Sequence, residues 1–262
     1  MARSIITLTS DFGLSDHFVG VMKGVILGIH PAARIVDITH DVGAFEIGEG
    51  AFVIAEASRW FPRGTVHVVV VDPGVGTARR PILVEAAGQF FLAPDNGVLS
   101  MLFTREKHKV RALMNDRLFL KPVSSTFHGR DIFAPVAAHL AKGLAPARCG
   151  KIIRDYLRLD FHKPVRTGRR FWTGAVLKID GFGNLITNFH IDEFPAIASR
   201  PFQFAIGTRR LTQLVATFAE GPPGEPVLVV GSSGYIEVVV NQASAARLLG
   251  VGVGAPAELT VY

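Results

Sequence analysis

The 262-residue sequence contains a single cysteine, Cys149. One thiol can form neither an intramolecular disulfide nor a thiolate zinc site, which excludes disulfide-stapled secreted domains. Mean hydropathy is high, at +0.32, but no uninterrupted apolar run approaches the roughly 18 residues that a membrane span needs. The first residues do not read as a signal peptide. We therefore expect a cytoplasmic protein that does not span a membrane.

The histidines and glycines also lack the spacings of two common kinds of site. The nine histidines form no HxxxH or HxH pair and no array with carboxylates, so we expect a site without metal. The segment 74–76 is too short for a dinucleotide-binding fingerprint. Lys and Arg exceed Asp and Glu by 28 to 22, an excess that can attract an anionic partner weakly. We expect the basic patches at 107–111 and 162–170 to be solvated surface or linker.

The first 160 residues alternate strand and helix patterns. Apolar and β-branched runs predict strands at 5–9, 34–39, 65–71, 81–85 and 90–92, with a turn at 86–89. Helices are predicted near 18–29, where apolar residues recur at three- and four-residue steps, and near 46–60, 97–104 and 131–142. Strands that alternate with helices predict an α/β domain with a mainly parallel central sheet, covered on both faces.

Composition changes after about residue 160. The segment 161–170 has little apolar periodicity and is predicted to be a linker. Short strand patterns follow at 171–179, 185–189, 227–230 and 235–240, separated by turns rich in Gly and Pro, with a short helix at 243–249. Closely spaced strands of this kind predict a smaller second domain over 171–262, built as an antiparallel sheet or barrel.

Three polar clusters lie where ligands bind in an open parallel sheet, beyond the carboxyl ends of strands. Asp11 and Asp16 follow the first predicted strand, Asp72 and Arg79 follow a later one, and His128 precedes a helix. Each has an ordinary structural interpretation as well. Asp11 and Asp72 could start turns, Asp16 could be a helix N-cap, and His128 could be a partly buried histidine. At one sheet edge, however, an Asp, an Arg and a His can form a charged, hydrogen-bonded cluster.

The order of the sequence motifs resembles one family. The motifs are TSDFG at 9–13 with Asp16, DPGVG at 72–76 with Arg79, PDNG at 94–97, TFHGRD at 126–131, IDGFGNLITN at 179–188 and GSSGYIEV at 231–238. Spread over almost the whole length, they resemble the S-adenosyl-L-methionine (SAM) hydroxide adenosyltransferases, adenosine-forming SAM hydrolases related to fluorinases and chlorinases. The resemblance implies a nucleoside-binding α/β domain over 1–160 and a β-barrel domain over 171–262. It also implies a homotrimer, with SAM between the first domain of one subunit and the second domain of its neighbour.

The resemblance further implies roles for individual residues. SAM would be the substrate and no cofactor would be needed; water would split the C5′–S bond to give adenosine and L-methionine, with Asp72, Arg79 and His128 as the catalytic set. Asp11 would accept hydrogen bonds from both ribose hydroxyls, and Asp16 would bind the methionine ammonium group. The other implied substrate-binding positions are Phe45, Val75, Asp95, Asn96, Gly129, Asp180, Asn184, Ser232 and Glu237.

The chemistry of that reaction limits what the catalytic set can do. Complete deprotonation of water by an ordinary Asp is uphill by roughly 16 kcal/mol, so free hydroxide is excluded as a resting species. We expect Asp72 and His128 to orient one water and take its proton as the C–O bond forms. Arg79 cannot act as a base and would hold Asp72.

Two alternatives to a SAM hydrolase stay open. The halide-dependent relatives carry hydroxyl side chains at the positions of Val75 and Gly129, and neither residue here can donate such a bond, so the sequence favours water over halide. The second alternative is a non-catalytic protein that binds nucleosides or RNA. Phe161, Phe171 and Trp172 beside an arginine-rich linker would support it.

Overall fold

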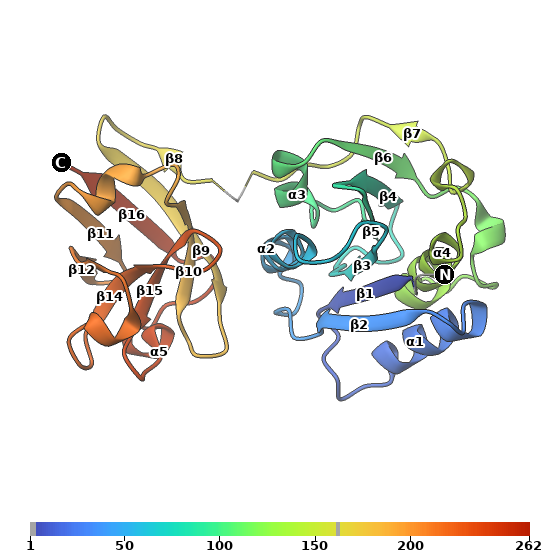
Figure 1. The fold of residues 1–262 in the computed structure, drawn as a ribbon, viewed down its shortest axis with the longest axis horizontal. Helices are drawn as coiled ribbons and strands as arrows, with labels where there is room; N and C mark the ends of the chain where they lie inside the picture. The colour runs from blue at the N-terminus through green and yellow to red at the C-terminus, as the bar shows by residue number, and fades with distance from the viewer. Residues whose placement is uncertain (1–3, 161–162) are drawn as a thin grey trace. The chain divides into compact units, whose positions relative to one another are not determined.

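The computed structural model describes residues 4–160 and 163–262, and its contacts divide the chain into two units, residues 1–159 and 160–262 (Figure 1). The first two residues of the predicted linker, 161 and 162, lie outside the described residues. Its later part is not wholly a linker, because Val165 and Arg166 form a short strand, β8, that pairs with β9 (Phe171–Ile179) of the second unit.

The first unit is built on a seven-stranded sheet. Its strands are β1 (Ile5–Ser10), β2 (Arg34–Thr39), β3 (Val66–Val70), β4 (Pro81–Ala86), β5 (Gln89–Pro94), β6 (His108–Ala112) and β7 (Ile152–Ile153). Its helices are α1 (Phe18–Ile29), α2 (Ile47–Ser58), α3 (Ser100–Arg105) and α4 (Ala134–Ala141), with a π-helical turn, η2 (Gly129–Phe133), leading into α4 and 3-10 turns at Asp116–Leu118 and Pro146–Arg148. All strands and helices predicted for this region are present, with their ends shifted by a few residues.

The sheet is mixed, so the prediction of a mainly parallel sheet holds for four of its strands and not for the other three. The strand order is β2-β1-β3-β5-β4-β6-β7. The first four strands run parallel, whereas the others join by antiparallel pairing. One cause is the tight turn of Ala87 and Gly88, both at positive φ, which folds β5 back along β4. The other is β6, which occupies most of the basic patch predicted to be solvated surface or linker.

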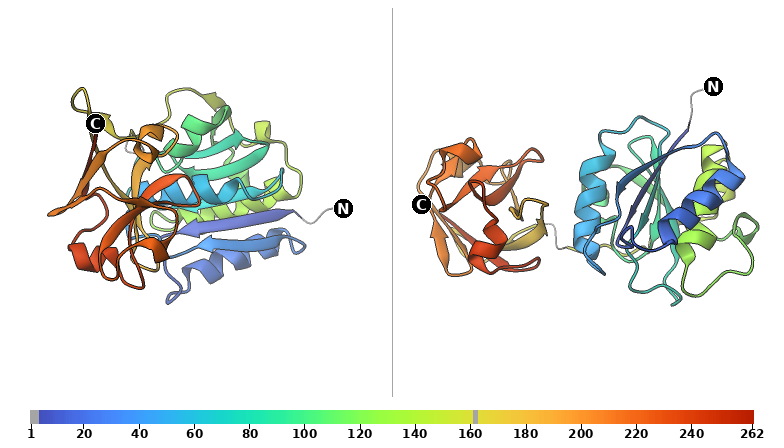
Figure 2. Two further views of the ribbon diagram at one scale, coloured as in Figure 1. Left: turned by 60° about the vertical axis from the view of Figure 1, so that its left-hand side comes forward. Right: turned by 90° about the horizontal axis from the view of Figure 1, so that it is seen from below.

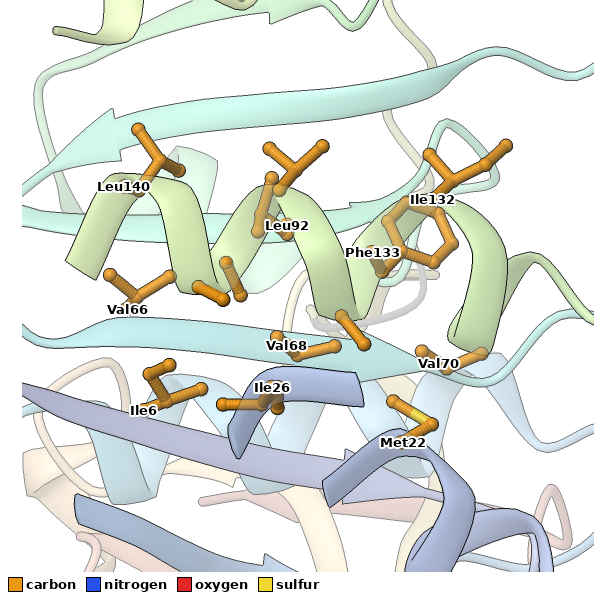
Figure 3. Close-up of a cluster of buried hydrophobic side chains, with 14 of the residues drawn as sticks. Ile6, Met22, Ile26, Val66, Val68, Val70, Leu92, Ile132, Phe133 and Leu140 are labelled. Atoms are coloured by element: carbon orange, nitrogen blue, oxygen red, sulfur yellow. The ribbon is translucent and has the colours of Figure 1, made fainter. Parts of the chain in front are cut away.

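Apolar side chains on both faces of β3 hold helices against the sheet. Figure 3 shows Val66, Val68 and Val70 packed with Met22 of α1 and Phe133 of η2. Val69, on the other face of β3, belongs to a second cluster, which includes side chains of α2 and α3. Consequently α1 and α4 lie on one side of the sheet and α2 on the other, as the right-hand view of Figure 2 shows. This arrangement leaves the carboxyl ends of the four parallel strands at one edge of the sheet.

The second unit is a curled sheet that encloses its own core. Its further strands are β10 (Leu185–His190), β11 (Phe202–Ile206), β12 (Arg209–Leu211), β13 (Leu214–Val215), β14 (Pro226–Val230), β15 (Tyr235–Val240) and β16 (Pro256–Val261), with helix α5 (Ala245–Leu249) and 3-10 turns at Pro195–Ala198 and Phe218–Glu220. The order is β12-β11-β16-β9-β10-β15-β14-β13, and pairing is antiparallel except between β13 and β14.

The curl brings the two ends of this sheet close together. Cα atoms of β12 and β14 approach within 8 Å, and Phe189, Phe204 and Ile236 fill the interior. The predicted small antiparallel sheet or barrel is thus present as a partly open barrel. None of the described helices in either unit combines the length and apolar character that crossing a bilayer requires.

Candidate active site

Polar residues follow each of the four parallel strands of the first unit. In sheet order they are His40 after β2, Asp11 after β1, Asp72 shortly after β3 and Asp95 after β5. Because parallel strands end at the same edge, their side chains gather there. The clusters that the sequence placed at strand ends therefore belong to one edge of one sheet.

Asp72, Arg79 and His128 contact one another at this edge. Arg79 donates from Nε to Asp72 Oδ1 at 3.0 Å and from Nη2 to Asp72 Oδ2. The same Nη2 lies 2.7 Å from His128 Nδ1. The Asp72 and Arg79 side chains are only 4% and 8% exposed, so the bidentate ion pair is largely withdrawn from water. The structure thus brings together the three residues predicted as the catalytic set.

A glycine lets the loop that carries Arg79 approach the loop that carries His128. Gly76 adopts φ of +79°, and a Cβ there would lie 2.3 Å from the backbone oxygen of Ser125. Only glycine fits both the left-handed conformation and the close approach. The turn is further held by Thr77, whose hydroxyl donates to the Gly74 carbonyl at 2.7 Å. The DPGVG motif therefore forms a turn that packs against the backbone of Ser125 and places Arg79 beside His128.

The contact with Arg79 fixes the protonation state of His128. A guanidinium has donors only, so Nδ1 of His128 must accept, and the ring proton must sit on Nε2. Partial burial, together with the positive charge of Arg79, lowers the pKa of His128. The imidazole is consequently neutral near pH 7, with Nε2–H as its outward donor. Arg79 Nη1 is buried and has no hydrogen-bond partner among the described residues.

Asp11 is tied to a strained residue on a neighbouring loop. Its Oδ2 accepts the backbone N–H of Phe45 at 3.0 Å. Phe45 has φ of +68°, a conformation that costs a residue with a side chain on the order of 1–3 kcal/mol, and the residue is 70% exposed. An exposed phenyl held in a strained backbone beside a carboxylate is typical of a ligand-binding position.

Three phenyl rings join the Asp11 loop to the His128 segment. The ring centroid of Phe127 lies 6.0 Å from that of Phe12 and 5.2 Å from that of Phe18. Gly129 packs in the same place, because a Cβ on it would meet the Met22 sulfur at 3.1 Å and the Phe127 ring at 3.3 Å. The sequence does not indicate this aromatic cluster, since only Phe12 lies at a strand end and its contacts with Phe18 and Phe127 depend on the packing of distant segments.

The other predicted residues of the first unit fall into two groups. Asp16 and Val75 lie on the loops just described. Asp16 is exposed, and because α1 begins at Phe18 with His17 as N-cap, the alternative of Asp16 as the helix N-cap is wrong. Asp95 and Asn96 instead brace the fold. Asp95 accepts from Arg80 and from the Leu157 N–H, while Asn96 donates to the Val71 carbonyl at 2.8 Å and accepts the Val98 N–H.

The predicted residues of the second unit form a separate polar cluster. Asp180 accepts both the backbone N–H and the side-chain amide of Asn184 at 2.9 Å. Burial raises the pKa of Glu237 to about 7, and the charge of Asp180 adds to the effect. Ser232 is exposed on the turn that precedes β15. Gly231 makes room for Glu237, because a Cβ there would lie 1.8 Å from Oε1.

Two polar residues near the site were not predicted to have a role, and for His40 the position after a strand would have indicated one. Asp131, which is buried, pairs with Arg130 and accepts the Ser124 N–H at 2.8 Å, so it holds the loop before His128. His40 directly follows a predicted strand, as Asp11 does, and its Nδ1 lies 2.7 Å from the Ser10 hydroxyl. In the described part of the chain, no group of three or more His, Cys, Asp or Glu is placed to hold a metal ion.

Comparison with known proteins places both units in one family. Residues 6–150 match the SAM hydroxide adenosyltransferase N-terminal domain, and residues 174–258 match the corresponding C-terminal domain. The chain is 39% identical to a (R)-S-adenosyl-L-methionine hydrolase of Salinispora tropica, covering 95% of both chains. It is 29% identical to a fluorinase of Actinoplanes sp., covering 91% of both. A crystal structure of an uncharacterized conserved protein from Thermotoga maritima superposes with a TM-score of 0.88 at 39% identity, covering 98% of this chain and 99% of that one.

Proposed function

This chain belongs to the SAM hydroxide adenosyltransferase family, and from that premise we propose how it acts. It is an enzyme that hydrolyses SAM at the C5′–S bond, and Asp72, Arg79 and His128 form its catalytic set. The observation that carries this assignment is the shared Arg79 guanidinium, which contacts both Asp72 and His128. A water molecule held beside this cluster would lie at the strand edge where the nucleoside is expected.

The bonds that change define what the cluster must supply. The water oxygen forms a bond to C5′ while the C5′–S bond breaks, and sulfur leaves as the neutral thioether of methionine. The leaving group needs no acid, so one proton from water is the only proton that must be removed. Charge is neutralised as the oxygen meets the sulfonium, and the burial of the Asp72 and Arg79 side chains supports surroundings of low dielectric, which strengthen this attraction.

The hydrogen-bond directions divide the roles within the set. His128 offers Nε2–H outward, so it can donate to the water oxygen but cannot take its proton without giving up Arg79. The Asp72 oxygens keep lone pairs beyond those used by Arg79, so Asp72 is the proton acceptor. Arg79 fixes the positions of the Asp72 carboxylate and the His128 ring relative to each other. Asp72 and His128 thus have separate roles in this proposal, whereas the sequence alone assigned both residues the same role.

Binding of the rest of SAM involves both units. In the first unit, Asp11 binds the ribose hydroxyls, Phe45 covers the ribose and sulfur, and Asp16 binds the methionine ammonium, while Val75 and Gly129 border the reacting atoms. In the second unit the binding residues are Asp180, Asn184, Ser232 and Glu237. We place Asp95 and Asn96 behind the site, because their polar atoms already bind Arg80, Leu157, Val71 and Val98.

We also propose that the protein is a homotrimer and that a neighbouring subunit supplies the second unit of each site. The support for this arrangement is the resemblance of the motifs, which implies such a trimer, and the match of both domains to that family. No cofactor and no metal enters the reaction as written. The single cysteine supports a cytoplasmic location.

The purified protein and SAM test the proposed activity. Wild type should release adenosine and L-methionine in equal amounts, and Asp72→Asn, which keeps the shape but removes the proton acceptor, should be slower by about 10² to 10⁴. Addition of chloride should give no 5′-chloro-5′-deoxyadenosine, since Val75 and Gly129 offer no hydroxyl to a halide. A wild-type protein that binds RNA in a steeply salt-dependent way and releases no methionine would instead support the binding-only alternative.

A further inference from the structure

A buried histidine connects the ends of the two strands beside the nucleoside site. His40 follows β2 and is 3% exposed. Its Nδ1 lies 2.7 Å from the hydroxyl of Ser10, the last residue of β1. On the other side of the ring, Nε2 lies 3.2 Å from Asp37 Oδ1 in an off-axis contact. Asp37 is held in turn by Lys23, whose Nζ donates to Oδ2 at 2.5 Å.

The side chains of Asp37, His40 and Ser10 each take a defined donor or acceptor role. A carboxylate paired with a lysine accepts only, so the proton of the imidazole sits on Nε2 and faces Asp37. Nδ1 is then a lone pair that accepts the Ser10 hydroxyl proton. The Ser10 oxygen is left free to accept the N–H of Phe12, which lies 3.4 Å away. Nε2 forms no hydrogen bond among the described residues, so Asp37 acts on the ring only through its charge at 3.2 Å, and the hydrogen bonds run from His40 through Ser10 to the backbone of Phe12, next to Asp11.

The backbone of His40 holds the same loop a second time. Its carbonyl accepts the N–H of Gly13 at 2.8 Å, and the Ser10 carbonyl accepts the N–H of Val42 at 3.3 Å. Asp11 lies between these attachments. Its own carboxylate closes the loop by accepting the Phe45 N–H. Two of these contacts involve His40, one on each side of Asp11 in the sequence, and they limit where the Asp11 carboxylate can lie.

We propose that His40 is a positioning residue for nucleoside binding, which fixes the Asp11 carboxylate through Ser10 and Gly13. The inference rests on the proposed function, in which Asp11 accepts both ribose hydroxyls. Ser10, His40 and Asp37 have the composition of a hydrolytic triad. Ser10 is buried, however, so its hydroxyl is not available to attack a substrate.

Discrimination between two nucleosides tests the role directly. Adenosine and 2′,3′-dideoxyadenosine differ only in the two hydroxyls that Asp11 would bind, so their affinity ratio measures that contact. By calorimetry, wild type should prefer adenosine by about tenfold or more. His40→Leu should lose most of this preference with little change in the affinity for the dideoxynucleoside. His40→Asn should recover part of it, since its Oδ1 can accept from Ser10 as Nδ1 does.

The chain offers a matched control at the opposite end of β1. His30 Nε2 lies 2.7 Å from the hydroxyl of Ser4, the residue before that strand. His30→Leu breaks a histidine–serine hydrogen bond of the same length, far along the strand from Asp11. It should leave the adenosine preference at the wild-type value. A fall in both variants would show a general loss of order and would overturn the proposal.

Two further variants separate the possible failures. Asp11→Ala should abolish the preference; if it does not, the ribose role of Asp11 is wrong and the positioning role falls with it. If Asp11→Ala abolishes the preference but His40→Leu keeps it, only the positioning role is overturned. Should His40→Leu fail to fold, Ser10→Ala removes the same hydrogen bond with a smaller change, and it should lower the preference in the same direction.

Discussion

His128 accepts a hydrogen bond from Arg79 through Nδ1, at 2.7 Å, so its ring proton is on Nε2. A histidine in this state is a donor toward any water on its outer side. This state of His128 favours one of two mechanisms that the sequence left open. In one His128 takes the proton of water, and in the other it only orients the water while Asp72 takes the proton.

Substitution of His128 by glutamine should distinguish these mechanisms. The amide nitrogen of Gln can donate where Nε2 donates, but it cannot accept a proton. We expect His128→Gln to keep kcat within about tenfold of wild type, and His128→Ala to lose 10² or more. A steady-state assay of adenosine release measures both. Equal losses in the two variants would assign the base to His128.

The pH profile of the same variants provides a second measurement. Burial and Arg79 lower the pKa of His128, so protonation, which would repel Arg79, occurs below the ordinary value of about 6.5. Activity of wild type should therefore fall on the acid side below pH 6.5. His128→Gln should lack that part of the fall, because its side chain does not titrate.

Gly76→Ala should impair the reaction without unfolding the first unit. The added Cβ would meet the Ser125 oxygen at 2.3 Å and would have to tolerate φ of +79°. The turn should move away from Ser125 and carry Arg79 from His128, while the sheet core stays intact. We expect kcat to fall at least tenfold and the far-ultraviolet circular dichroism to remain that of wild type. Gly64→Ala, also at positive φ (84°) but with nothing within 4 Å of its Cβ position, is the control for backbone strain alone.

The strand-end rule accounts for what the sequence could and could not predict. Asp11 and Asp72 could be placed at one edge of the sheet, because the strands before them are apolar runs typical of a buried parallel sheet. The strand β6 was not predicted, because only Val110 and Ala112 are buried in it and Arg111 pairs with Glu85 of β4. A charged residue paired across a sheet looks like solvated surface in the sequence. The antiparallel pairing of β6 with β4, which contributes to the mixed sheet, therefore could not be predicted from the sequence.

The site residues show the same limit. The contact between Asp72 and Arg79 spans seven residues, and the resemblance of the motifs predicted it. The convergence of Phe12, Phe18 and Phe127 depends on the packing of α1 against η2, and no local pattern signals it. Long-range packing of side chains therefore accounts for the part of the site that the sequence did not predict.

His67 should make the protein sensitive to acid. It is fully buried in β3, with Nδ1 2.7 Å from the Thr7 hydroxyl, and burial lowers its pKa to about 4. In the unfolded chain this histidine binds a proton at about pH 6.5. The contribution of neutral His67 to the free energy of unfolding is therefore fully present above that pH and decreases as the pH falls toward 4, by up to about 3 kcal/mol. Denaturant unfolding between pH 7 and 4 should show a smaller loss in the Thr7→Val/His67→Leu double variant. The exposed His17→Gln variant should behave as wild type; equal slopes in all three would contradict the prediction.

Glu237 should make the protein less stable as the pH rises, the opposite of the effect of His67. Its pKa is raised to about 7 from 4.5, chiefly by burial. The folded chain therefore keeps a proton that the unfolded chain releases. This contribution to stability is complete below pH 4.5 and is lost as pH rises toward 7, by up to about 3 kcal/mol. Glu237→Gln, which cannot ionise, should lack this loss in the unfolding of the second unit, whereas Glu258→Gln, on an exposed position of β16, should retain it.

Co-expression of two inactive variants tests whether each site is built from two subunits. Asp72→Ala removes the proposed proton acceptor of the first unit, and Asp180→Ala removes a proposed binding residue of the second. If a neighbouring subunit completes each site in a ring of three, every mixed trimer contains one site, about a third of its sites, in which both halves are intact. Purification through two different tags should then recover adenosine release that neither variant shows alone at low SAM. If each chain forms its own site, every site in the mixture carries one lesion, and the mixed oligomer stays as inactive as its parents.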